Sequence, residues 1–372
     1  MEANDILLII IGFAGALAVF LYAMKLMSEG LQKVAGSRLR AALARFTDNP
    51  VKGIATGIGV TAAIQSSSAT TVMVVSFVNA GLLSLEGAVA VIMGANIGTT
   101  VTAWIITLLG LGGGDGLFSL PLTIAAVSFY FLVSKKDRMR NIGQTVMGLA
   151  LLLVGMELLQ AAMPDLGQYP ALLRGIASLS GYGFWSVLIF VGIGTLLTCL
   201  VQASAAMMAI TLVMCYNGWI GLDMAVALVM GQNIGTTITA NLAATVANTA
   251  GKQAARAHLL FNVAGVLITL ALFTPMLHLI AEVTHAVSGA SPHTSAAVIP
   301  LAISFFHTLF NVGNTLLLAF FIPQIIWLVN RMVVEGRPSR LALLMQRVKE
   351  CVYCVGNTCS RGLLWVYGMN RT

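Results

Sequence analysis

Long apolar segments separated by short polar ones dominate the chain. Apolar runs of helical length occur at about residues 6–24, 117–133, 142–163, 257–280 and 297–330. Each run is close to or above the roughly 20 residues that an α-helix needs to cross a bilayer. A transmembrane β-barrel would need short segments of alternating polarity instead. The pattern therefore predicts an all-α polytopic membrane protein.

One polar segment stands inside otherwise apolar sequence, and it occurs twice. Residues Thr61–Thr71 read TAAIQSSSATT, and 137 residues later the chain reads TCLVQASAAMM. The same register continues into GANIGTTVTA at Gly94–Ala103 and GQNIGTTITA at Gly231–Ala240. Between Gly57–Trp104 and Gly194–Asn241, 19 of 48 positions are identical. Because Gln, Asn, Gly and Thr are among the identities, we interpret this similarity as an internal duplication.

The first polar motif predicts a re-entrant hairpin. It splits the apolar stretch at 53–78 into halves of about a dozen residues, and each half is too short to cross a bilayer. A single span whose Ser and Thr side chains bond to their own helix is the alternative. We favour the hairpin, because the motif precedes a glycine-marked end at Asn79–Gly81 and, in the second copy, at Asn217–Gly218.

The second element of each copy contains the other motif at its centre. Residues Glu86–Leu109 carry GANIGTT, and residues Asp223–Thr245 carry GQNIGTT. Two glycines four residues apart are typical of a close helix-packing face. A locally unwound helix that offers backbone and side-chain oxygens would also explain the repeated Asn and Thr residues. We therefore expect both helices to be broken at these motifs.

Composition and charge support a membrane protein and give it an orientation. The chain is 58% hydrophobic and 9% charged, and its formal net charge is +7. Basic residues gather after the first run, after the 117–133 run, at Lys252 and Arg256, and after the last run, whereas the intervening loops hold one basic residue, Arg174. By the positive-inside rule the basic clusters face the cytoplasm. This places the N-terminus outside and makes the two copies antiparallel.

These observations divide the chain into four parts. We expect transmembrane repeat 1 at 1–140, transmembrane repeat 2 at 141–280, a final transmembrane helix segment at 281–330 and a cytoplasmic basic tail at 331–372. The first apolar run lacks a basic stretch before it, which favours a retained span over a cleaved signal peptide. The predicted fold has two inverted-topology repeats with re-entrant helical hairpins and broken helices.

The duplicated motifs indicate the chemistry of a site near the bilayer midplane. They contain no Asp, Glu, Lys, Arg or His, so divalent metals are disfavoured, whereas sodium accepts neutral oxygen ligands. Half-helices that begin after the two turns would direct free N–H groups to the centre, which suits an anion. The residues thus predict a sodium-coupled anion carrier, without choosing the anion.

The paired motifs also carry a family resemblance. QSSSAT before GANIGTT, followed by a second Q-x-S motif, GQNIGTTITAN and RAHLLFN, resembles the type II sodium–phosphate cotransporters in their bacterial branch, over about residues 1–330. The resemblance implies sodium-driven uptake of inorganic phosphate across a bacterial inner membrane, with Na+ as the co-transported ion and no organic cofactor. Ala203 and Ala205 depart from the pattern, because many relatives have Ser there.

We assign candidate site residues on this combined basis. Phosphate is expected at Gln65, Ser66, Ser67, Ser68, Asn96, Gln202, Ser204 and Asn233, and sodium at Ser67, Thr99, Thr100, Ser204, Thr236 and Thr237. The alternatives are a carrier of another anion such as sulfate or a carboxylate, a membrane sensor that does not transport, and an intramembrane enzyme. An enzyme is disfavoured because neither motif supplies a base for a nucleophilic serine. A homodimer is left open.

A shorter echo occurs later in the chain. HLLFN at His258–Asn262 returns as HTLFN at His307–Asn311. A His and an Asn four residues apart share one helix face. We expect these pairs to cap or cross-link helices and do not assign them to the site.

Overall fold

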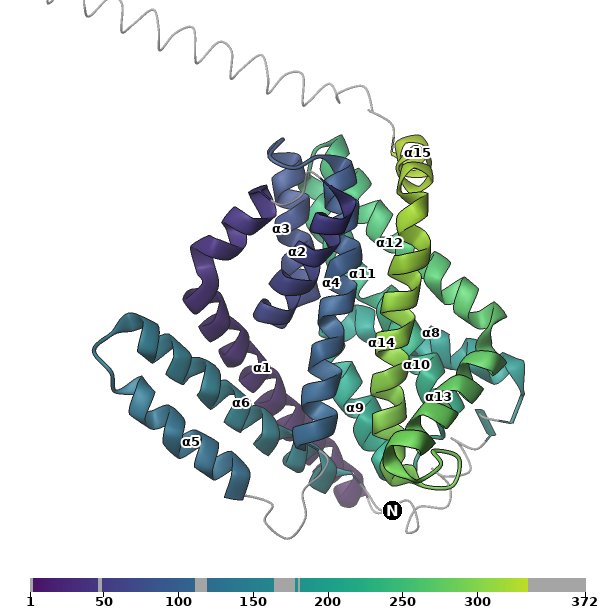
Figure 1. The fold of residues 1–372 in the computed structure, drawn as a ribbon. Helices are drawn as coiled ribbons and strands as arrows, with labels where there is room; N and C mark the ends of the chain where they lie inside the picture. Colours follow the sequence, from purple (N-terminus) through teal and green to yellow (C-terminus); the bar gives the residue numbers. More distant parts are fainter. Residues whose placement is uncertain (1–2, 46–48, 111–118, 164–177, 180, 334–372) are drawn as a thin grey trace, which may run out of the picture. The chain divides into compact units, whose positions relative to one another are not determined.

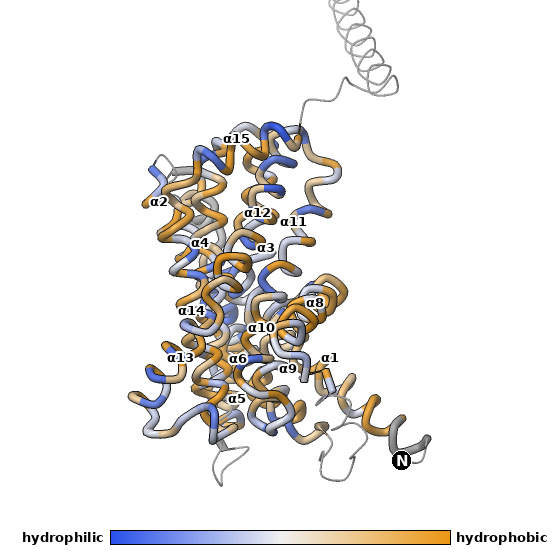
Figure 2. The backbone as a smooth tube through the Cα atoms, turned by 90° about the vertical axis from the view of Figure 1, so that its right-hand side faces the viewer, coloured by the Kyte–Doolittle hydropathy of each residue, from blue (hydrophilic) through white to orange (hydrophobic). Residues whose placement is uncertain are grey.

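The structure is a computed structural model that describes residues 3–45, 49–110, 119–163, 178–179 and 181–333 (Figure 1). Over these residues it contains helices and no strands. Six of the described helical segments are long and apolar enough to cross a membrane, and Figure 2 shows hydrophobic residues along most of the helices. The predicted all-α polytopic class is confirmed. Most of the expected outer loops, at 111–116 and 164–177, and the tail from residue 334 lie outside the described residues.

The helices follow the order of the two sequence copies. The first copy comprises α1 (Ala3–Arg45), α2 (Pro50–Ile64), α3 (Ser67–Asn79), α4 (Leu85–Ile105) with a π-helical turn at Ile106–Gly110, and α5 (Ser119–Leu132). The second comprises α6 (Asp137–Ala162), α8 (Phe184–Val201), α9 (Ser204–Tyr216), α10 (Leu222–Gly235), α11 (Thr237–Ala243) and α12 (Thr249–Ala271). Three further helices follow, α13 (Phe273–Ser288), α14 (Ile299–Leu318) and α15 (Ile322–Met332).

Each copy contains two helices joined by a tight turn, which is the predicted hairpin. The turn residues Gln65 and Gln202 have φ values of 57° and 54°, and they are the only non-glycine residues with positive φ in the described part of the chain. Helices α2, α3 and α9 have 15, 13 and 13 residues, so they extend about 20 Å and do not cross a core of about 30 Å. Helix α8, with 18 residues, is longer but also ends at its turn.

The two hairpins enter the helix bundle from opposite ends. The α3 end meets the start of α12, because the Asn248 N–H donates to Asn79 Oδ1 at 2.7 Å and Asn248 Nδ2 donates to Asn79 O at 3.0 Å. The α9 end, at Gly218, instead lines a cavity with His293 and Ser295 in the α13–α14 loop. In Figure 1 the α2–α3 hairpin lies in the upper half and α9 in the lower half. This arrangement agrees with inverted repeats.

The expected break at GANIGTT is wrong for the first copy, because α4 is continuous from Leu85 to Ile105. In the second copy α10 ends at Gly235, yet Thr236 keeps right-handed helical angles and its N–H donates to the Gln232 carbonyl at 3.0 Å. Helix α11 then begins at Thr237, so the second motif is interrupted as expected, although Thr236 is not extended, whereas the first motif is not interrupted.

The glycines of these motifs serve close packing instead. A Cβ on Gly94 would collide with the Ile54 carbonyl of α2, and a Cβ on Gly231 with the equivalent Val191 carbonyl of α8. Gly57 and Gly194 on the partner helices are equally close to the carbonyls of Val91 and Leu228. Because a side chain at any of these positions would separate the helices, the small-residue face is the correct interpretation.

The two late apolar runs are also divided. The run expected at 257–280 splits between α12 and α13, and the run at 297–330 contains a 3₁₀ turn at Ala319–Phe321. Pro275 and Pro323 follow these interruptions. A proline lacks the N–H group for an intrahelical bond, and its ring clashes with the carbonyl four residues earlier. Helix α12, which contains the start of the 257–280 run, begins at Thr249. There Asn248 Oδ1 accepts a hydrogen bond from the Gly251 N–H at 2.9 Å.

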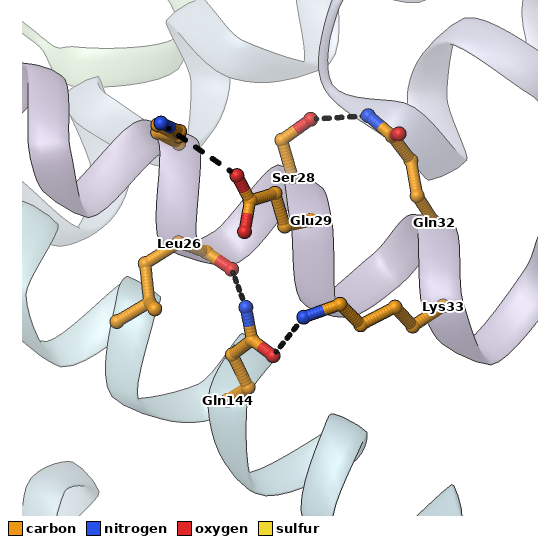
Figure 3. Close-up of polar contacts among 7 residues, drawn as sticks. Leu26, Ser28, Glu29, Gln32, Lys33 and Gln144 are labelled. Carbon is orange, nitrogen blue, oxygen red and sulfur yellow. Dashed lines mark hydrogen bonds and ion pairs between the residues drawn. The ribbon is translucent and has the colours of Figure 1, made fainter.

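Helices α1 and α6 pack antiparallel along much of their length. A Cβ on Gly148 would collide with Met27, and one on Gly155 would lie within 3.1 Å of Phe20. Polar side chains add a second connection, which Figure 3 shows. Lys33 Nζ donates to Gln144 Oε1 at 3.0 Å, and Gln144 Nε2 donates to the Leu26 carbonyl at 3.4 Å. This packing fixes the part of α1 that reaches the hairpin turns.

Candidate functional site

The two hairpin turns line one cavity, which we call the tip cavity. The residues that the turns contribute are Gln65, Ser66, Ser67, Ser68, Gln202 and Ser204. A second cavity, which we call the inner cavity, is lined by Asn96, Thr99, Asn233 and Thr236 together with Ser67 and Ser204. The shared serines make the two cavities neighbours. The structure thus brings ten of the twelve predicted site residues to these two cavities. The other two, Thr100 and Thr237, line neither cavity.

The first turn is held by side-chain hydrogen bonds. Gln65 Nε2 donates to the Ala62 carbonyl at 2.6 Å, and Gln65 Oε1 accepts from Thr102 Oγ1 at 3.0 Å. Ser28 of α1 donates to the Ile64 carbonyl at 2.7 Å. Residues in the left-handed region other than glycine cost free energy and persist where surrounding contacts hold them. Here Gln65 is 9% exposed, and its side chain is fixed at both ends.

The two turns end at the N-termini of α3 and α9. The first N–H groups of a helix have no partner within the helix and lie at its positive dipole end. Ser66 precedes α3, and its Oγ accepts a hydrogen bond from the Ala69 N–H at 3.2 Å. Ala203 precedes α9 and offers no side-chain cap. Both ends lie at the tip cavity, which makes the cavity suited to an anion.

The second turn is less firmly bonded than the first. Gln202 is exposed. Thr198 and Thr239, the counterparts of Thr61 and Thr102, have buried hydroxyls without a hydrogen-bond partner in the described structure. In the first copy Thr61 Oγ1 donates to Thr70 Oγ1 at 3.0 Å, but Met207 replaces that threonine in the second copy. The duplicated sequence therefore adopts two different hydrogen-bond arrangements.

The asparagines of the second motif also differ between the copies. Asn96 Nδ2 donates to Asn262 Oδ1 at 3.2 Å, and His258 Nε2 lies 3.4 Å from Asn96 Oδ1. The expected cross-linking role of the HLLFN pair is therefore observed between α12 and α4. Asn233 instead donates to the Val229 carbonyl of its own helix at 2.8 Å.

Threonine hydroxyls supply oxygen ligands of the kind that sodium accepts. Thr99 donates to the Ala95 carbonyl at 3.1 Å, and Thr236 donates to the Gln232 carbonyl at 2.8 Å. A hydroxyl that donates its hydrogen keeps lone pairs for a cation. Thr100 and Thr237 are buried and donate to the carbonyls of Ile97 and Ile234. Among the described residues, no group of three or more His, Cys, Asp or Glu residues could hold a metal ion.

Several lining residues were not predicted from the sequence. Lys25, Ser28 and Thr102 line the tip cavity, and Gln232 and His307 line the inner cavity. Thr102 could have been found, because it is duplicated as Thr239. His307 belongs to the second His–Asn pair, for which only helix capping or cross-linking was expected. Lys25 has no sequence signal beyond its position directly after the first apolar run.

Comparisons with known proteins give one family model and several relatives. A family model described as Na+/Pi-cotransporter matches residues 19–161 and 186–306. The chain is similar to the putative inorganic phosphate export protein YjbB of Escherichia coli K12, at 31% identity over 85% of this chain and 54% of that protein. It is 31% identical to the uncharacterized protein YqeW of Bacillus subtilis over 84% of this chain and 94% of that protein.

A mammalian relative matches a shorter part. Sodium-dependent phosphate transport protein 2A of Rattus norvegicus is 39% identical over 26% of this chain and 16% of that protein. The chain spans about half the length of the YjbB proteins that it matches. No solved structure matches it.

Proposed function

The chain belongs to the Na+/Pi-cotransporter family, and on this basis we propose that it carries inorganic phosphate across the membrane together with sodium ions. Family membership favours a transporter over an enzyme. We further propose uptake by alternating access, in which the two inverted repeats expose the tip cavity to one side at a time. The membrane is proposed to be the bacterial inner membrane, with the N-terminus outside and the C-terminus in the cytoplasm.

One observation carries the proposal of an anion as the substrate. Two helix N-termini, those of α3 and α9, end at the same cavity, and hydroxyl and amide groups from both turns line it. The N–H groups and the dipoles of both helices favour negative charge there. The phosphate residues proposed are Gln65, Ser66, Ser67, Ser68, Asn96, Gln202, Ser204 and Asn233.

Sodium coupling is supported by the neighbouring oxygen groups. Thr99 and Thr236 line the inner cavity, and Ser67 and Ser204 border both cavities. We propose that sodium binds among these residues, and we retain Thr100 and Thr237 as candidates that need a local rearrangement to contribute. A cation beside the anion would lower the cost of moving phosphate charge through the membrane.

The names of the relatives do not decide whether this chain imports or exports phosphate. One name says export and another says sodium-dependent transport. A carrier that couples phosphate to sodium follows the sodium gradient, so an inward gradient would drive uptake. The homodimer considered from the sequence stays a hypothesis.

Radiolabelled phosphate uptake into proteoliposomes tests this function. An inward sodium gradient should drive accumulation, whereas an equal potassium gradient should not. Competition by sulfate, arsenate and succinate tests the choice of anion. Ser67→Ala should reduce uptake strongly, while Ser76→Ala on the same helix is the control, because Ser76 is bonded to the Val72 carbonyl away from both cavities. Uptake driven by protons in sodium-free medium would contradict the proposal.

A further inference from the structure

Lys25 is the only charged residue among the described residues that line the tip or the inner cavity. It lies on α1 within the candidate membrane span Leu7–Ala35. Three residues further along, Ser28 binds the Ile64 carbonyl beside the first turn. An ionisable residue in a membrane span is costly unless it faces water or a partner. Its position at the cavity therefore needs an explanation.

The ammonium group of Lys25 is weakly engaged in this structure. Its nearest acidic partner is Glu29, with 3.9 Å between Nζ and Oε1. The side chains are 73% and 44% exposed. Ion pairs with such exposure contribute little to stability. Most of the three donor positions of the ammonium group are thus free to bind an anion in the cavity.

Lys33 on the same helix shows the contrasting arrangement. Its Nζ donates to Gln144 Oε1 at 3.0 Å, and it lines neither cavity. Figure 3 shows Lys33 directed to Gln144 of α6. Long basic side chains commonly extend along apolar surface to reach water. Extension toward water would explain how both lysine side chains are oriented. It does not explain why Lys25 lies beside the two turns.

We propose that Lys25 is a further substrate-binding residue, which supplies a positive charge to the phosphate anion in the tip cavity. The proposal rests on the proposed function, because it assumes phosphate as the anion. Glu29 competes for the same ammonium group and thereby weakens binding. Neutral donors at the turns orient the anion, and Lys25 raises its affinity through charge.

The test compares four variants in phosphate titrations of uptake at saturating sodium. Lys25→Gln should raise the KM for phosphate about tenfold, the effect expected from losing one charge-assisted hydrogen bond. Lys25→Arg should restore most of the affinity. Glu29→Gln should lower the KM, because it removes the competing carboxylate. Lys33→Gln is the matched control and should keep the wild-type KM.

Equilibrium binding of radiolabelled phosphate to the purified protein gives a second readout that does not require transport. Lys25→Gln should weaken this binding by the same factor while the melting temperature stays unchanged. A wild-type KM and wild-type binding in Lys25→Gln would overturn the assignment and leave the transport function intact. An equal loss in Lys25→Gln and Lys33→Gln would also overturn it, since it would show a general effect of charge. A wild-type protein that neither binds nor carries phosphate would refute the proposed function and this assignment together.

Discussion

Thr102 Oγ1 donates a hydrogen bond to Gln65 Oε1 at 3.0 Å, and the bond connects the first turn to α4. The duplicated pair does not repeat it, because Thr239 Oγ1 is buried without a partner and Gln202 is exposed. Two copies of one sequence motif are thus seen in a bonded and an unbonded arrangement. In a carrier built from inverted repeats, such a difference is expected to reverse when the cavity opens to the other side.

The first prediction is that Thr102 and Thr239 stabilise opposite states of the proposed carrier. Thr102→Val removes the bond seen here. It should lower the population of the state described here, relative to the opposite state, by about fivefold, since one such bond contributes about 1 kcal/mol. Thr239→Val should shift it in the opposite direction. The measurement is thiol labelling of a cysteine at Ala205 from each side of the membrane, in a protein without its native cysteines. Thr245→Val, an exposed position outside both cavities, is the control. Shifts of Thr102→Val and Thr239→Val in the same direction would refute the prediction that these two threonines stabilise opposite states.

The second prediction concerns the hydroxyls that the second turn lacks. Ser66 and Ser68 both line the tip cavity, and Ser66 Oγ, which accepts from the Ala69 N–H, keeps its own hydrogen for an anion. Ser68→Ala and Ser66→Ala should therefore each weaken the apparent phosphate affinity about tenfold. Ala203→Ser and Ala205→Ser together should tighten binding or add a sodium site. Uptake titrations in phosphate and sodium measure both effects. Unchanged affinities and Hill coefficients in all three variants would show that the asymmetry has no bearing on transport.

The third prediction tests the close packing of α2 against α4. Gly57→Ala places a Cβ against the Val91 carbonyl and should lower the free energy of unfolding by about 2 kcal/mol. Gly59→Ala on the same helix meets no atom within 4 Å, so it should be neutral or slightly stabilising. Thermal unfolding of the purified variants gives the comparison. Equal stabilities would mean that the two helices separate without cost.

The structure agrees with the sequence where a local feature decides the outcome. The hairpins were predicted because the polar motif at Gln65 divides an apolar segment into halves that are each too short to cross a membrane, and because the motif recurs at Gln202. The continuity of α4 was not predicted, because the role of Gly94 depends on how closely α2 approaches it. The duplication of Thr102 as Thr239 was visible in the sequence, but its bond to Gln65 was not, since the two residues lie 37 positions apart. The cavities gather most of the predicted binding residues, but their roles stay predictions.

The fourth prediction fixes the orientation in the membrane. Asp137 stands beside a basic cluster that the positive-inside rule places in the cytoplasm. His293 is exposed in the α13–α14 loop, which we expect outside. In a protein without its five native cysteines, a cysteine at position 293 should react with an impermeant thiol reagent from outside, and one at position 137 should not. Asp115 would serve equally from the sequence but lies outside the described residues. The opposite labelling would invert the proposed topology.

The last prediction separates two threonines that the sequence treats alike. Thr99 lines both cavities, whereas Thr100 is buried and lines neither. Both donate their hydrogen to a carbonyl of their own helix, so only the position of the remaining lone pairs distinguishes them. Thr99→Val should therefore raise the sodium concentration for half-maximal uptake several-fold, because it removes a neutral oxygen ligand.

Thr100→Val keeps the cavity lining and should leave that sodium concentration close to the wild-type value. Sodium titrations of phosphate uptake measure both variants, and lithium in place of sodium tests whether the ligands tolerate a smaller ion. Magnesium should not substitute, because the described residues that line the two cavities include no carboxylate. A larger effect at Thr100 than at Thr99 would show that sodium binds within the α4 packing face, and it would exclude the inner cavity as the sodium site.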